Sequence, residues 1–236
     1  MKYSGGLIKK EREQIFKLFL QYDKLKFNEI EKALGIRSNM VSYHLEKMQE
    51  EDLVEKKGFY YYLTNKAERY LPIIPHVIGK ELSPLPVVLV ALVNNDKLLL
   101  IKRNIRPYKG YWSLIGGKML HEESFKGASK RLIRNKAGIN ARFESINSVF
   151  YEHVESDDII KHSFILFLTK MKTKEEKFKE SEYGRLKWLK ISEVDKEKII
   201  PSDLWLIKNK LNSKIDVKSA HMIENQGELE SFKFTD

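Results

Sequence analysis

The segment GGKMLHEESFKGASKRLIRNKAGI, residues 116–139, holds the residue types that could bind a phosphate group beside a metal ion. Five residues separate Gly117 from Glu123, and seven more separate Glu123 from Arg131. Carboxylates beside a glycine turn could hold Mg²⁺, because this ion prefers anionic oxygen ligands. The helical part, however, reads Arg-Leu-Ile-Arg-Asn-Lys and contains no carboxylate. The stretch therefore looks like the frame of a metal-dependent phosphate site whose helix lacks the carboxylates that a metal ion needs.

The charge of the surrounding segment also favours an anionic ligand. Residues 102–136 contain ten Lys and Arg, and their only acids are Glu122 and Glu123. Guanidinium and ammonium groups bind phosphate directly, although a lysine on a helix is more often simply solvated. The candidate ligand-binding residues are Arg103, Lys118, Arg134 and Lys136.

Composition limits the class of protein. The chain has 236 residues, of which 42% are hydrophobic and 32% charged, so it can bury a core. The net charge of +10 favours anionic partners. The absence of cysteine excludes thiolate chemistry. The first residues, MKYSGGLIKKEREQ, lack the apolar run of a signal peptide, and no stretch approaches the roughly 18 apolar residues of a membrane helix. We expect a cytoplasmic protein without membrane contact.

A proline-rich stretch divides the sequence. Residues 72–86 contain four of the six prolines, which interrupt helices and inner strands. We therefore predict a first domain at 1–72, a linker at 73–85, a second domain at 86–213 and a tail at 214–236. The positive charge is spread over both domains, with +3 in residues 1–83 and +7 in residues 84–236.

The first domain resembles a winged helix-turn-helix. Helical patterns at 7–21, 27–35 and 38–50 precede a hairpin at 54–62, where Lys56-Lys57-Gly58 gives the turn signal. In such domains the third helix enters the major groove and the hairpin is the wing. A protein–protein module is the alternative, because the net charge of this domain is modest. The resemblance implies double-stranded DNA as the partner and these contact residues: Arg37, Ser38, Asn39, Ser42, Tyr43, Lys47, Lys56 and Lys57.

The second domain alternates short apolar strands with two helices and resembles the Nudix family over about residues 86–211. Gly117, Glu123, Arg131 and Gly138 stand at the spacing of the family signature, and GYWSLIGGK resembles its upstream run. The resemblance implies an α/β/α sandwich with a mixed sheet, and hence an α+β chain. It also implies that Glu123 pairs with Arg131 and that these four residues frame the pocket.

The departures from the signature determine the functional prediction. The family has metal-binding glutamates where this sequence has Leu132, Asn135 and Lys136, which share one helix face. Leucine offers no ligand, and lysine repels a cation. We therefore expect no catalytic residue, no metal and no cofactor.

Together these features predict a DNA-binding transcriptional regulator, acting as a homodimer, whose second domain senses a nucleotide or other phosphorylated metabolite. Nudix-related regulators usually have the opposite domain order, so their effectors cannot be carried over. One alternative is a Mg²⁺-dependent hydrolase of nucleoside diphosphate compounds with metal ligands from elsewhere. A structural interaction protein is another alternative. The candidate ligands of such a hydrolase are Glu152, Glu155, Asp157 and Glu182.

Overall fold

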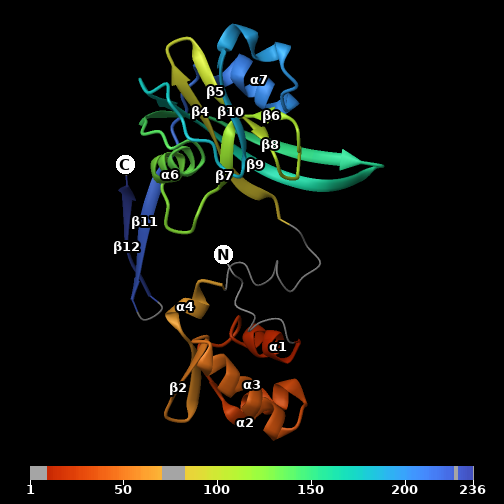
Figure 1. Cartoon of the computed structure of the whole chain (residues 1–236). Coiled ribbons are helices and arrows are strands. Elements are labelled where there is room, and N and C mark those ends of the chain that lie inside the picture. Colours follow the sequence, from red (N-terminus) through yellow and green to blue (C-terminus); the bar gives the residue numbers. More distant parts are fainter. Residues whose placement is uncertain (1–9, 71–82, 226–227, 236) are drawn as a thin grey trace. The chain divides into compact units, whose positions relative to one another are not determined.

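The computed structural model describes residues 10–70, 83–225 and 228–235. The chain divides into two compact units, Met1–Ser83 and Pro84–Asp236 (Figure 1). Most of the predicted linker 73–85 lies outside the described residues. None of the helices in the described residues is long and apolar enough to span a membrane.

The first unit is a small helical domain with a three-stranded sheet. The strands are antiparallel in the order β1-β3-β2. Gly35 ends α2 in the left-handed conformation, which favours glycine, and so allows the tight turn into α3. The elements are α1 (Lys10–Leu18), β1 (Leu25–Lys26), α2 (Phe27–Leu34), α3 (Ser38–Glu50), β2 (Val54–Lys57), β3 (Tyr60–Leu63) and α4 (Asn65–Glu68).

The helices of the first unit are held by one apolar core. Val41, Leu45 and Met48 recur on one face of α3 and are fully buried, together with Phe16 of α1 and Ile30 of α2. Because this face is committed to the core, the opposite face of α3 is the one available to a partner.

The start of α3 has no side-chain cap. The cap position is Arg37, and its side chain makes no capping hydrogen bond, although the serine that follows is a common capping residue. Ser38 is instead the first helical residue, and its hydroxyl donates to the carboxylate of Glu31.

The second unit is built on a mixed sheet. Its main strand order is β10-β5-β4-β9-β8, with β6 beside β5 and β7 beside β4. The β4 and β9 strands are parallel, while the other pairs are antiparallel. The elements are β4 (Leu85–Asn94), β5 (Lys97–Arg103), β6 (Trp112–Ser113), β7 (Ile115–Lys118), α6 (Phe125–Ala137), β8 (Arg142–Ser156), β9 (Ile159–Lys172), β10 (Gly184–Lys190), η3 (Ile191–Lys196) and α7 (Pro201–Lys210).

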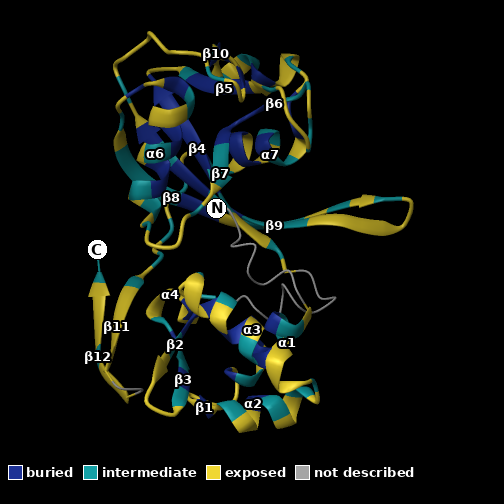
Figure 2. Cartoon of the chain, turned by 60° about the horizontal axis from the view of Figure 1, so that its bottom comes forward, coloured by how far each residue is buried: buried dark blue, intermediate teal, exposed yellow. Residues whose placement is uncertain are grey.

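Each face of this sheet is covered by a helix. Alternate residues of β4 belong to different cores: Val88 and Val90 face α6, whereas Leu89 and Ala91 face α7. The strands between the helices are accordingly buried (Figure 2). The α+β class and the layered, mixed-sheet architecture are thus confirmed.

Two ribbons extend from the second unit. The outer part of β8 and β9 continues past the rest of the sheet and is largely exposed (Figure 2). Much of the predicted tail forms a hairpin of its own, β11 (Ser219–Asn225) with β12 (Glu228–Thr235).

The left-handed residue that ends α6 provides a test of the fold. Gly138 has φ 69°, and an added Cβ would lie 3.2 Å from Cβ of Lys179. We expect Gly138→Ala to lower the free energy of unfolding by about 1 to 2 kcal/mol, because this conformation is strained for other residues. Tryptophan fluorescence in a denaturant titration measures it selectively, since all three tryptophans lie in the second unit.

Gly127→Ala is the matched control within the same helix. An added Cβ there meets nothing closer than Oγ of Ser124 at 3.4 Å. Because glycine inside a helix is less favourable than alanine, we expect the free energy of unfolding to rise by about 0.5 to 1 kcal/mol. Equal losses in both variants would contradict the conformational explanation.

Candidate functional site

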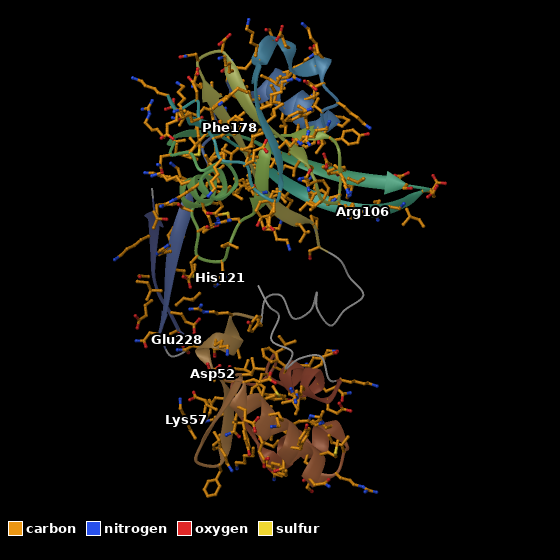
Figure 3. All side chains as sticks on the ribbon, viewed as in Figure 1. Asp52, Lys57, Arg106, His121, Phe178 and Glu228 are labelled. Atoms are coloured by element: carbon orange, nitrogen blue, oxygen red, sulfur yellow. The ribbon has the colours of Figure 1, made fainter. Side chains whose placement is uncertain are left out.

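The predicted glycine turn is instead strand β7, and an ion pair fastens the loop that follows β7 to α6. Arg131 Nη2 donates to Glu123 Oε2 at 2.8 Å and to the carbonyl of Lys118 at 2.9 Å, while Arg131 Nε donates to Glu123 Oε1. The amide of Leu120 also donates to Glu123 Oε2, at 2.9 Å. Both carboxylate oxygens are thus engaged, and the loop that contains His121 (Figure 3) is anchored at its two ends. Glu123 acts here as a structural group.

The replaced positions of α6 do not fit a magnesium ion. Leu132 is only 3% exposed and packs so closely that a Cβ on Gly117 would lie 2.6 Å from its Cδ2. Asn135 is exposed and offers one neutral oxygen. Lys136 donates from Nζ to the carbonyl of Gly116 at 2.5 Å. A hard dication needs several anionic oxygens, and this helix face offers none.

A cavity of about 580 Å³ lies against β7 and α6. Three of the four predicted ligand-binding cations, Arg103, Lys118 and Lys136, line it. Arg134 does not line this cavity; it borders a separate depression on the outer side of α6. The remaining walls are mainly apolar, including Val87, Leu89, Ile101, Leu114, Phe164, Leu166 and Ile200.

Polar groups that the sequence analysis did not select also line this cavity. Ser113 is 2% exposed, and its hydroxyl has no hydrogen-bond partner among the described residues. Asp203 is buried and accepts a hydrogen bond of 2.7 Å from the amide of Leu114. Burial raises the pKa of Asp203 to about 7, against the opposing effect of that hydrogen bond. Near neutral pH this carboxyl can therefore either donate or accept a proton.

A second pair of side chains lies beside Asp203. Tyr108 donates from its hydroxyl to Glu152 at 3.2 Å, and burial raises the pKa of this phenol. Arg103 donates from Nε to the carbonyl of Pro107 at 2.9 Å.

One feature of the sequence could have indicated that polar groups line this cavity. The polar residue Ser113 stands between the apolar residues Trp112 and Leu114.

The comparisons with known proteins agree with this geometry. Residues 83–208 match the NUDIX domain model. The chain belongs to the Nudix family. Residues 9–56 match the model of the bacterial regulatory protein arsR family, so the first unit is an ArsR-type helix-turn-helix. The predicted combination of a helix-turn-helix with a Nudix domain is confirmed.

Individual relatives cover the Nudix part of the chain. The uncharacterized Nudix hydrolase YvcI of Bacillus subtilis (strain 168) is 27% identical over 113 residues, which are 48% of this chain and 70% of that protein. The MutT protein of Bacillus halodurans has 26% identity and a TM-score of 0.48, covering 63% of this chain and 96% of that chain. The NUDIX domain of Shewanella oneidensis NrtR, solved in complex with ADP ribose, has 18% identity and a TM-score of 0.48. The match covers 60% of this chain and 94% of that chain.

The predicted DNA contacts lie on α3 and on the wing. Asn39 and Tyr43 are exposed on α3, and Arg37 is exposed just before it. Lys57 lies on the wing (Figure 3) and pairs with Glu55. Lys56 lies 5.4 Å above the ring of Tyr61. The turn of the wing also exposes Phe59, which the sequence analysis did not select.

Several of these contact candidates interact with glutamates of their own unit. Besides Ser38, the hydroxyl of Ser42 lies 3.4 Å from Glu46, and Lys47 Nζ lies 2.6 Å from Glu50. Exposed pairs of this kind contribute little to stability, so DNA phosphates could replace the glutamates at small cost.

The carboxylates of the hydrolase alternative are not gathered into one site. Glu152 lines the cavity, whereas Glu155 and Asp157 are exposed on the β8–β9 ribbon and Glu182 is exposed before β10. Across the described residues, no group of three or more His, Asp or Glu side chains is arranged to hold a metal ion.

The ion pair between Glu123 and Arg131 predicts a pH-dependent stability. Hydrogen bonding from Arg131 lowers the pKa of Glu123 below its ordinary value of 4.5. The pair therefore stabilises the fold above about pH 4.5, and this stabilisation is lost as the pH falls through the lowered pKa. We expect Glu123→Gln to cost about 1 kcal/mol at pH 7, measured by denaturant unfolding.

Two comparisons make this expectation specific. The difference between Glu123→Gln and the wild type should shrink below pH 4.5. Glu122→Gln, an exposed neighbour, should change stability by less than about 0.5 kcal/mol. A loss in Glu123→Gln that does not change with pH would show that the carboxylate charge is not the cause.

Proposed function

We propose that this protein is a DNA-binding transcriptional regulator whose Nudix domain binds a nucleotide-type metabolite without hydrolysing it. The observation that carries the proposal is the cavity beside the Nudix box. It combines basic side chains, apolar walls and buried polar groups on one unit of a chain that also has a helix-turn-helix.

The lining of the cavity favours a ligand with two chemically different ends. Lys118 and Lys136 can meet a phosphate or diphosphate group. Ser113 and Asp203 can hydrogen-bond to a flat polar group such as a nucleobase, with apolar side chains against its faces. A buried hydroxyl without a partner is unfavourable, and such a ligand would satisfy it. An ADP-ribose-like compound has both kinds of end.

The absence of hydrolysis is proposed from the replaced positions of α6. Cleaving a diphosphate requires charge neutralisation and an activated water, which metal ions usually supply. Leu132 is part of the core and Lys136 is positively charged, so the box cannot use the family's metal ligands. The hydrolase alternative would require the separated carboxylates to be rearranged.

A homodimer is the natural form for such a regulator. Winged helices read paired half-sites, and two copies supply two recognition helices. Ligand binding would then act by favouring one arrangement of the two helices over another. The mass of the full chain in solution, measured by light scattering with and without duplex DNA, tests this part.

DNA binding by the first unit gives distinct expectations for two kinds of contact. We expect the chain to select a duplex sequence from a random library and to lose affinity steeply as salt increases. Asn39→Ala should cost about 1 to 3 kcal/mol on the selected site, because amide side chains read base edges. Lys56→Gln should weaken all sequences similarly and lower the salt slope by about 1. Fluorescence anisotropy measures both.

Lys126→Gln is the control for the loss of one positive charge, because Lys126 is exposed on α6 in the Nudix unit. It should leave DNA affinity unchanged. The same titrations repeated with ADP-ribose, ADP and a nucleoside diphosphate sugar test the sensing role, with an expected shift of about 5- to 150-fold for a true effector. Absence of DNA binding would favour the protein–protein alternative, and Mg²⁺-dependent product formation would favour the hydrolase.

A further inference from the structure

The three residues of α6 that stand in place of the family's glutamates, Leu132, Asn135 and Lys136, lie in different surroundings. Leu132 is committed to the core between α6 and the sheet. Asn135 lines the cavity but is exposed. Lys136 alone brings a charged group to the cavity wall, on the side of β7. If any residue compensates for the missing metal, the structure singles out Lys136.

The Lys136 ammonium is held in place by strand β7. Its Nζ donates to the carbonyl of Gly116 at 2.5 Å and lies 4.8 Å from the centre of the Tyr183 ring. An ammonium has three N–H donors, so these contacts leave donor capacity for a ligand. The two contacts fix the position of the charge without neutralising it.

Glu152 and Asp203 line the same cavity as Lys136. Among the described residues, however, no ion pair joins a carboxylate to the Lys136 ammonium, whose Nζ bonds to the carbonyl of Gly116. Burial lowers the pKa of Lys136 to about 8, and the charges of Arg103 and Arg131 add to this effect. The side chain is nevertheless mostly protonated at pH 7. A partly buried cation among other cations is unfavourable and would be stabilised by an anion in the cavity.

We propose that the Lys136 ammonium replaces the divalent cation of the Nudix site, so that this protein binds the diphosphate group of its ligand without metal. This inference rests on the proposed ligand-binding function. A compact point charge on α6 would neutralise part of the diphosphate charge from the helix face where the family binds its ion, with Arg103 and Lys118 also lining the cavity. It would supply no activated water, which agrees with binding rather than hydrolysis.

A structural role is the competing explanation. Lysines in the last turn of a helix interact favourably with its dipole, and Lys136 is one residue from the end of α6. If the role of Lys136 is structural, its replacement should lower the free energy of unfolding. It should not change whether ligand binding requires a metal ion. The two explanations therefore differ in a measurable quantity.

The experiment is calorimetric titration of the full-length chain with ADP-ribose and with inorganic pyrophosphate, in EDTA and in Mg²⁺. The wild type should bind with about equal affinity in both buffers. Lys136→Met should lose about 10- to 100-fold in EDTA, because one charge-assisted contact disappears. Lys136→Arg should retain most of the metal-free affinity. Lys126→Met, on the exposed side of the same helix, should remain within about twofold.

A charge reversal gives the sharpest result. Lys136→Glu should bind more weakly than Lys136→Met in EDTA and recover at least about tenfold in Mg²⁺, since this ion is commonly held by one or two carboxylates together with ligand phosphates. A merely structural lysine would not give a metal-dependent recovery. Tryptophan fluorescence of each variant shows whether the second unit is folded.

The outcomes separate the inference from the function on which it rests. If the wild type binds ADP-ribose only in Mg²⁺, or if Lys136→Met binds as the wild type does in EDTA, metal replacement by Lys136 is wrong while ligand binding stands. If the folded wild type binds neither probe in either buffer, the proposed nucleotide-binding function itself is wrong.

Discussion

Glu123 and Arg131 join the loop after β7 to α6, and the wall of the cavity depends on this pair. The carboxylate accepts from both the guanidinium and the amide of Leu120, while the guanidinium also reaches the carbonyl of Lys118. Gly117, in β7, lies directly against Leu132. An added Cβ at Gly117 would lie 2.6 Å from Cδ2 of Leu132, so the Leu132 side chain would have to shift. The frame of the Nudix box therefore serves packing as well as any ligand.

The substitutions on α6 change the electrostatics of the cavity while the frame is kept. In the family, acidic side chains attract a dication, and the dication attracts the phosphate. In this chain the positive charges that line the cavity belong to the protein, and one of them is held by a backbone carbonyl of β7. An anion in this cavity would therefore be attracted directly by protein side chains.

In the first unit, several side chains predicted to contact DNA are bonded to carboxylates of the same unit. Its third helix commits one face to the core and leaves polar side chains on the other, several of them bonded to nearby glutamates. Exposed pairs of this kind contribute little to stability. They also limit the net positive charge of the surface, so sequence-specific DNA binding by this unit would depend on base contacts more than on charge.

The sequence by itself was enough to predict the two domain types, the layered α+β class and the pairing of Glu123 with Arg131, because its motifs resemble two known families that imply these features. It also showed that three glutamate positions of the box are replaced. It could not assign Ser113 and Asp203 to the cavity, because the contact of α7 with the β6–β7 segment joins residues 89 positions apart. Helix spacing places Lys136 on the face of Leu132 and Arg134 on another face. Only the packing of α6 against the sheet shows that the face with Lys136 borders the cavity, whereas Arg134 borders the outer depression.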